Sequence, residues 1–182
     1  LYLNQKNYAL NMCINSQYYS LNLTTHQKPN PKVAPSFCML LRKYILGMHI
    51  KNFITNDLER VVTIEIEGFD EVDDIINYKL IIELMGKHGN ILLLDSSNNI
   101  IDCIRHIYIE DDSNSKTRNL LPHYKYTYPI SDKNSFFDIN NYEDFKKVIK
   151  ISDFAEIDIN NLTRNIIENI NGISKTFIKN II

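Results

Sequence analysis

Residues 84–95 read Leu-Met-Gly-Lys-His-Gly-Asn-Ile-Leu-Leu-Leu-Asp, and this stretch decides the fold. A strand-like run at residues 78–84 leads into a short connection with two glycines, and a second run at residues 90–95 leads out of it. Because glycine reaches positive φ at low steric cost, Gly86 and Gly89 are both expected to reverse the chain sharply. The stretch therefore predicts a tight hairpin on a rigid sheet.

Three polar residues would stand at the tip of this hairpin: Lys87, His88 and Asn90. Binding residues often lie on loops that a rigid scaffold positions. A solvated turn, whose polar residues only keep it in water, is the simpler interpretation. The spacing taken alone favours the solvated turn.

The composition is that of an ordinary globular chain of 182 residues, with 44% hydrophobic and 23% charged residues. A formal net charge of −2 argues against a generally basic nucleic-acid-binding coat but is compatible with a local basic patch. The three cysteines, an odd number without a CxxC pair, argue against a disulfide framework or a zinc site. We therefore expect no metal, no cofactor, no membrane-spanning segment and a cytoplasmic location.

One helix is expected among the strands of the first part of the chain, at residues 35–46. Pro35 suits its first turn, Gly47 suits a left-handed cap after it, and its apolar residues share one face. Arg42 and Lys43 point away from that face, which indicates either helix-end electrostatics, the simpler interpretation, or a contact with phosphate. Further strands are expected at residues 8–14, 18–23, 49–54, 58–67 and 100–109.

These elements predict an α+β fold, in which an antiparallel β-meander or partial barrel carries one packed helix. Helices then follow at about residues 141–151 and 161–170, and Ser174 is placed to cap a third helix. We therefore divide the chain into a β-rich domain, residues 1–135, and a helical region, residues 136–182. The turn before Ser174 makes that region resemble the start of a helix-hairpin-helix segment.

Four motifs, in order and with plausible spacing, resemble one known family. They are SFCMLLRK at residues 36–43, LERVV at 58–62, IELMGKHGNILL at 82–93 and RNLLP at 118–122. Together they are similar to NFACT-N, the N-terminal domain of the RqcH/NEMF proteins, whose bacterial members carry the older name fibronectin-binding protein A. The resemblance implies a fold similar to the N-terminal domain of MutM-type DNA glycosylases. It also implies a truncated domain, because the family's own N-terminal segment would lie before Leu1.

The resemblance implies a function in ribosome-associated quality control. Family members bind a large ribosomal subunit obstructed by peptidyl-tRNA. Bacterial members recruit alanyl-tRNA, and alanine tails are added to stalled nascent chains without a template. The chain is therefore expected to be a bacterial, non-enzymatic module that binds tRNA and the ribosomal RNA of the large subunit.

The resemblance also implies which residues bind tRNA. The family carries an Asp-Arg pair needed for tRNA handling, and Glu59-Arg60 stands at that position, with a carboxylate one methylene further out. The planar donors of arginine suit phosphate. The other residues expected in the site, all from the four motifs, are Arg42, Lys43, Lys87, His88, Asn90 and Arg118. Gly89 and His123 depart from the family, which usually has serine and glycine there.

Two other functions are open at this stage. The older family name suggests a surface adhesin that binds fibronectin, against which the unpaired cysteines argue. Fold similarity alone suggests a DNA glycosylase. That chemistry needs an N-terminal amine nucleophile, a proline in MutM-type enzymes, whereas this chain starts at Leu1.

Overall fold

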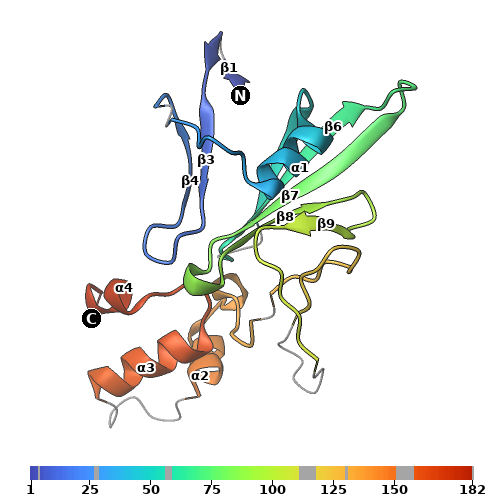
Figure 1. Cartoon of the computed structure of the whole chain (residues 1–182). Coiled ribbons are helices and arrows are strands. Elements are labelled where there is room, and N and C mark those ends of the chain that lie inside the picture. The colour runs from blue at the N-terminus through green and yellow to red at the C-terminus, as the bar shows by residue number, and fades with distance from the viewer. Residues whose placement is uncertain are drawn as a thin grey trace. The chain divides into compact units, whose positions relative to one another are not determined.

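The computed structural model describes residues 1–3, 5–26, 29–55, 59–110, 118–129, 131–150 and 158–181. The chain divides into two compact units (Figure 1). The first unit comprises residues 1–55 and 60–128, and the second comprises residues 129–182 with Glu59. The change from strands to helices along the chain follows the expected order, and the α+β class with antiparallel sheets is confirmed.

The first unit is built on a five-stranded sheet whose strands lie side by side in chain order. Every neighbouring pair is antiparallel, as expected for a meander. The strands are β5 (His49–Thr55), β6 (Val61–Phe69), β7 (Ile75–Glu83), β8 (Asn90–Leu94) and β9 (Ile100–Cys103). The turn between β7 and β8 contains a short 3-10 helix, η1 (Gly86–His88), drawn in green at one end of the sheet in Figure 1.

Two small hairpins precede the sheet in the chain. The first, which the sequence did not predict, pairs β1 (Tyr2–Leu3) with β2 (Lys6–Asn7). The second pairs β3 (Ala9–Cys13) with β4 (Ser20–Thr24), and its register runs from Ala9 opposite Thr24 to Cys13 opposite Ser20. The loop at residues 14–19 therefore lies at the end of β3 that is remote from the N-terminus.

One face of the sheet is covered by α1 (Ser36–Ile45), the predicted helix. Pro35 stands one position before the helix rather than inside its first turn, and Gly47 has the expected left-handed φ of +85°. The apolar stripe of α1 and residues of β3 pack on the sheet residues Ile64, Ile66, Leu80, Ile82, Ile91 and Leu93. The 3.6-residue period in the sequence thus identified the buried face of the helix correctly.

The opposite face of the sheet is covered by the segment at residues 118–128, through Leu120 and Tyr126. Its apolar sheet residues are Val61, Ile81, Leu92, Leu94, Ile100 and Cys103. Because β8 is covered on both faces, all five of its residues are buried. This explains its uninterrupted apolar run, since alternation is expected only where one face of a strand meets water.

The second unit holds η2 (Phe136–Asp138), α2 (Tyr142–Ile149), α3 (Ile159–Asn169) and α4 (Lys175–Lys179). Its core is formed by Ile149, Ile166, Ile170 and Ile178. Asn141 caps α2 by accepting a hydrogen bond from the Asp144 N–H, and Ser174 caps α4 by accepting one from the Phe177 N–H. The three predicted helices are therefore confirmed. No helix within the described ranges is both long enough and apolar enough to cross a membrane.

The strand expected at residues 100–109 is the clearest difference from prediction, because β9 ends at Cys103. The chain bends there, and the Ile104 N–H donates to the Ile91 carbonyl at 3.0 Å. The cause is the side chain of Asn90, which accepts a hydrogen bond from the Arg105 N–H and donates one to the Arg105 carbonyl. Local periodicity does not report a contact between residues so far apart in the chain.

Candidate nucleic-acid interface

The turn between β7 and β8 is tight and needs its two glycines for different reasons. Gly86 has φ +57°, in the left-handed region that favours glycine, as predicted. Gly89 has φ −58°, so the expectation of a second positive φ was wrong. A Cβ on Gly89 would instead lie 3.1 Å from the Glu83 carbonyl oxygen. The Gly89 N–H donates to the Gly86 carbonyl at 3.1 Å, which closes the turn.

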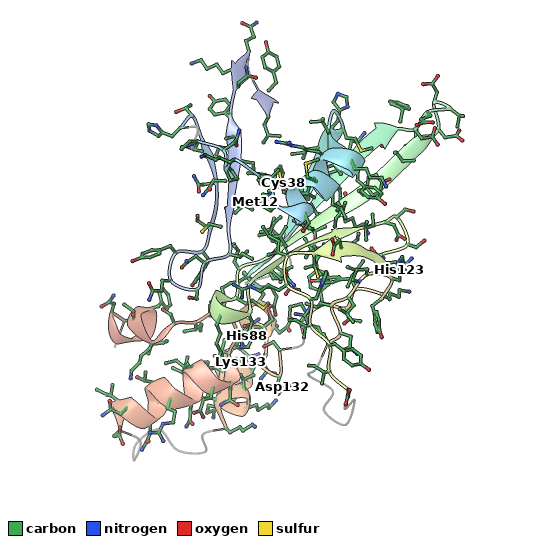
Figure 2. All side chains as sticks on the ribbon, in the orientation of Figure 1. Met12, Cys38, His88, His123, Asp132 and Lys133 are labelled. Carbon is green, nitrogen blue, oxygen red and sulfur yellow. The ribbon has the colours of Figure 1, made fainter. Side chains whose placement is uncertain are left out.

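Of the three residues expected at the tip, the structure exposes Lys87 and His88 and buries Asn90. Figure 2 labels His88 on the green turn. Both hydrogen-bonding groups of the Asn90 side chain are used internally, its amide N–H by the Arg105 carbonyl and its oxygen by the N–H groups of Ile91 and Arg105. Asn90 is therefore a structural support beneath the turn and is not presented to a ligand.

Arg105 is a basic residue that the sequence analysis did not place in the site. It is exposed, and its Nη1 donates to the Lys87 carbonyl at 2.7 Å. The bend after β9 thereby brings its guanidinium to the turn. The signal that could have found it is weak: a basic residue following a strand that pairs with β8.

Arg60 immediately precedes β6 and lies at the same end of the sheet. Its carbonyl accepts a hydrogen bond from the Leu84 N–H at 2.7 Å, just before the turn. Its exposed guanidinium donates to the Tyr19 hydroxyl at 3.4 Å and lies 5.8 Å from the centre of the Tyr19 ring. Arg60 is thus held at the mouth of β6 by contacts that leave it accessible to solvent.

We call the group formed by Arg60, Lys87, His88 and Arg105 the cationic edge. Its members come from three separate parts of the chain and gather at one end of the sheet. This is the end at which Figure 1 draws the green turn η1. None of the three permanently charged members forms a salt bridge with another residue that the structure describes. Solvent-exposed cations whose charge is not neutralised by a nearby carboxylate are suited to binding an anion such as phosphate.

Glu59, the neighbour of Arg60 in the chain, belongs to the second unit. Its carboxylate accepts a hydrogen bond from the Asn171 side-chain amide at 2.8 Å. Asn171 opens the turn before α4, and its own oxygen accepts a hydrogen bond from the Gly172 N–H at 3.0 Å. The Glu59 carboxylate is therefore held by a contact within the second unit.

Arg118 lies inside the first unit. Its Nη1 and Nη2 donate to the two oxygens of Glu83 at 2.8 Å and 3.1 Å, and its Nη1 also donates to the Thr127 carbonyl. The Tyr126 hydroxyl donates to the same carboxylate at 2.8 Å. Burial lowers the pKa of Arg118, but the hydrogen bonds and charge of Glu83 outweigh it and raise the pKa above its ordinary value. Arg118 therefore supports the end of β7, where the turn begins.

Arg42 and Lys43 are exposed on α1, as expected, but not beside the turn. Met48, just after the helix, packs on Gly68: a Cβ there would lie 2.6 Å from the Met48 Cγ. Gly68 is near the last residue of β6, whereas Arg60 precedes the first. The structure therefore places Arg42 and Lys43 toward the opposite end of the sheet from the cationic edge.

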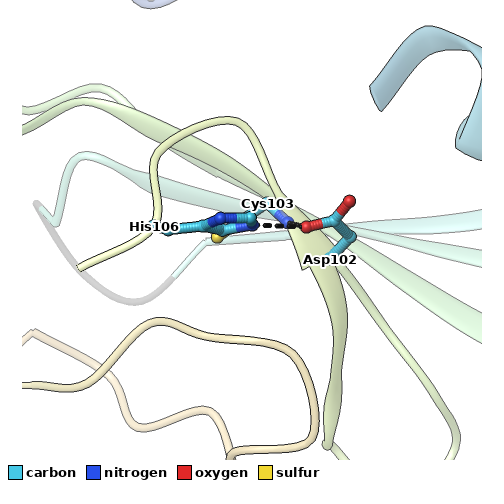
Figure 3. Close-up of side chains that lie close together, drawn as sticks. All are labelled: Asp102, Cys103 and His106. Carbon is cyan, nitrogen blue, oxygen red and sulfur yellow. Dashed lines mark hydrogen bonds and ion pairs between the residues drawn. The ribbon is translucent and has the colours of Figure 1, made fainter. Parts of the chain in front are cut away.

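Asp102, Cys103 and His106 form a group of possible metal ligands, although the sequence showed no such cluster (Figure 3). Their ligand atoms lie within 4.8 Å of one another, and His106 Nε2 is 2.6 Å from Asp102 Oδ1. The buried Cys103 thiol donates to the carbonyls of Arg105 and Leu120, and burial raises its pKa to about 11. Because the Cys103 thiol and the His106 ring both make internal hydrogen bonds, we interpret the group as a support of the bend that carries Arg105.

Comparison with known proteins gives a consistent result. The family described as NFACT N-terminal and middle domains matches residues 1–182. The Rqc2 homolog RqcH of Bacillus subtilis is 31% identical over 176 residues, which cover 96% of this chain and 29% of that protein. The Rqc2 homolog RqcH of Streptococcus suis is 35% identical over 127 residues, which cover 69% of this chain and 22% of that protein. The chain thus spans less than a third of these relatives.

Solved structures share the fold. The N-terminal domain of fibronectin-binding protein PavA from Streptococcus pneumoniae has a TM-score of 0.80 and 29% identity, covering 99% of this chain and 64% of that chain. The fibrinogen binding protein from Staphylococcus aureus has a TM-score of 0.76 and 28% identity, covering 97% of this chain and 59% of that chain.

Proposed function

Because this chain belongs to the family of NFACT N-terminal and middle domains, we propose that it is the tRNA- and large-subunit-binding module of a ribosome-associated quality control factor. In this proposal it holds alanyl-tRNA or peptidyl-tRNA on the large ribosomal subunit. It supports the template-free addition of alanine to stalled nascent chains in the cytoplasm, and it carries out no chemical step itself.

The observation that carries the proposal is the cationic edge. Arg60, Lys87 and Arg105 present charge at one end of a sheet whose strands are tied together up to that end. Contacts with phosphate and sugar position a protein on a nucleic acid, and their number sets the salt dependence of binding. An edge of this kind accounts for RNA binding by a chain with a net charge of −2, because the local distribution of charge decides the field.

Glu59 has a positioning role in this proposal. The family's acidic residue beside the arginine is one methylene longer here, and its carboxylate is held by the Asn171 amide. That hydrogen bond lies within the second unit and holds Glu59, the residue before Arg60 in the chain. Contact of Arg42, Lys43 or His88 with tRNA remains a prediction, as do the likenesses to the MutM-type domain and to a helix-hairpin-helix segment.

Binding of fluorescently labelled tRNA, followed by anisotropy over a series of salt concentrations, tests the proposal. Arg60→Ala should weaken binding about 5-fold to 10-fold and reduce the slope of log K against log salt by about 1, as expected for one lost phosphate contact. Lys51→Ala is the matched control, because Lys51 is an exposed cation on β5 that pairs with Glu67 at the other end of β6. Equal affinity for tRNA in the Arg60 variant and the parent chain would contradict the role given to Arg60.

Binding to the large subunit is tested separately by co-sedimentation of the chain with subunits that carry peptidyl-tRNA and with empty subunits. The proposal expects retention on the obstructed subunits that Arg60→Ala lowers. The adhesin alternative is supported only by what the solved relatives are called. Immobilised fibronectin gives the corresponding test of that alternative, in which Arg60→Ala and Lys51→Ala should behave alike.

A further inference from the structure

The loop between β3 and β4 carries two exposed aromatic rings beside the cationic edge. Tyr18 is 74% exposed and Tyr19 is 40% exposed. A single exposed aromatic residue needs no explanation, but here two consecutive tyrosines are exposed and the Tyr19 ring lies next to Arg60 of the cationic edge.

This loop is packed against the turn that carries Lys87. A Cβ on Gly86 would lie 3.8 Å from the Ser16 carbonyl oxygen, and a Cβ on Gly89 would lie 3.2 Å from the Ile14 Cβ. Within the loop, the Asn15 side chain accepts a hydrogen bond from the Gln17 N–H at 2.9 Å. The tyrosines are therefore presented by a loop whose base is fixed to the sheet, at the same end as η1 (Figure 1).

Arg60 belongs to the cationic edge and also contacts the loop that carries the tyrosines. Its guanidinium lies 5.8 Å from the centre of the Tyr19 ring and donates to the Tyr19 hydroxyl at 3.4 Å. Proteins that hold single-stranded nucleic acid combine aromatic rings, on which bases stack, with cations that follow the phosphates. Paired RNA stems keep their bases stacked inside the helix and offer mainly phosphates and 2′-hydroxyl groups, on which an aromatic ring cannot stack.

We propose that Tyr18 and Tyr19 form a stacking site for an unpaired RNA base, whose neighbouring phosphates contact Arg60, Lys87 and Arg105. The inference rests on the proposed binding of tRNA and adds the kind of nucleotide that this edge takes, namely one outside the paired stems. Arg60 then has two roles, since it contacts a phosphate and orients the Tyr19 ring.

The test compares two labelled probes by anisotropy with the full 182-residue chain: an oligouridylate, and an abasic RNA oligomer of the same length that keeps the phosphates and lacks the bases. The parent chain should bind the oligouridylate more tightly. The double variant Tyr18→Ala/Tyr19→Ala should weaken oligouridylate binding roughly 5-fold to 100-fold and leave abasic binding unchanged. Arg60→Ala should weaken both. Tyr2→Ala is the control, because Tyr2 is also exposed but lies on β1, at the other end of β3.

The outcomes separate this inference from the proposed function. If the double tyrosine variant binds oligouridylate and tRNA as the parent does while Arg60→Ala weakens tRNA binding, the stacking site is wrong and the proposed function stands. If the parent chain binds the abasic oligomer as tightly as oligouridylate, the stacking site is likewise wrong. If the folded parent chain binds neither tRNA nor oligouridylate, both proposals are wrong. Circular dichroism of each variant verifies that it is folded.

Discussion

Replacing Arg118 by methionine should destabilise the first unit strongly without acting on RNA binding directly. The change removes the two hydrogen bonds to Glu83 and the one to the Thr127 carbonyl. It leaves Glu83, which is fully buried, with only the Tyr126 hydroxyl as a side-chain partner among the described residues. Methionine keeps much of the apolar volume of the arginine stem, so the lost charge dominates.

The expected loss is about 4 kcal/mol in the free energy of unfolding. Removing one partner of a buried ion pair costs about 3–5 kcal/mol, because the other charge stays buried without compensation. The middle of this range applies here, since the Glu83 side chain is 0% exposed while the Arg118 side chain keeps 15% of its surface exposed. A surface ion pair would instead contribute only about 0–1 kcal/mol.

Urea unfolding followed by circular dichroism measures this loss. The sheet lies wholly in the first unit, so its β-sheet signal reports the relevant transition even if the helical unit unfolds separately. The double variant Glu83→Leu/Arg118→Met should recover much of the stability lost in Arg118→Met, because no charge is then buried. Lys51→Ala, which breaks an exposed pair with Glu67, is the control and should cost under about 1 kcal/mol.

A loss below about 1 kcal/mol for Arg118→Met would refute the argument. A double variant no more stable than the single one would refute the claim that the unpaired charge is the cause. If Arg118→Met stayed folded and still lost tRNA affinity as Arg60→Ala is expected to, Arg118 would be a ligand-contacting residue after all, as the family motif implied.

Three further predictions concern the turn and the core. Asn90→Ala should cost about 2 kcal/mol and speed amide hydrogen exchange at Arg105, whose N–H and carbonyl lose their partners. Gly86 and Gly47 have φ +57° and +85°, so Gly86→Ala and Gly47→Ala should each lower the free energy of unfolding, measured in urea, by about 1 kcal/mol. Only Gly86→Ala should also weaken tRNA binding, because only that turn presents Lys87. Stability should fall as the pH rises from about 9 towards 11. The pKa of the Cys103 thiol is near 9.0 in the unfolded chain and about 11 in the folded chain, so over this range ionisation stabilises the unfolded chain relative to the folded one. Urea titrations at pH 8 and pH 10.5 should show this fall, and Cys103→Ala should make it shallower.

Local patterns predicted the elements that depend on neighbouring residues. The apolar period of α1, the run that becomes β8 and the caps at Asn141 and Ser174 were all evident in the sequence. His123 is also instructive. It has φ +71°, so this position is left-handed, and the family's usual glycine there has a steric explanation.

What the sequence could not predict depends on pairing between distant residues. Arg118 and Glu83 are 35 positions apart, and nothing near either one shows that both are buried. Asn90 follows a polar turn and therefore resembles a surface residue, yet it holds a bend that begins after β9. That same bend brings Arg105 to the cationic edge. Periodicity does not reveal the bend, so it placed Arg105 wrongly within a strand.

The chain order of the five-stranded sheet has a consequence for how this unit folds. Each strand pairs with the one that precedes it, so the sheet can grow hairpin by hairpin with short loops to close, which favours rapid folding. The burial of Glu83 does not follow this strand-by-strand order, because its partner Tyr126 comes 43 positions later in the chain. Until that segment docks, the carboxylate at the end of β7 stays in water. We therefore expect closure over it to be a late step, and the buried network to slow unfolding more than it speeds folding.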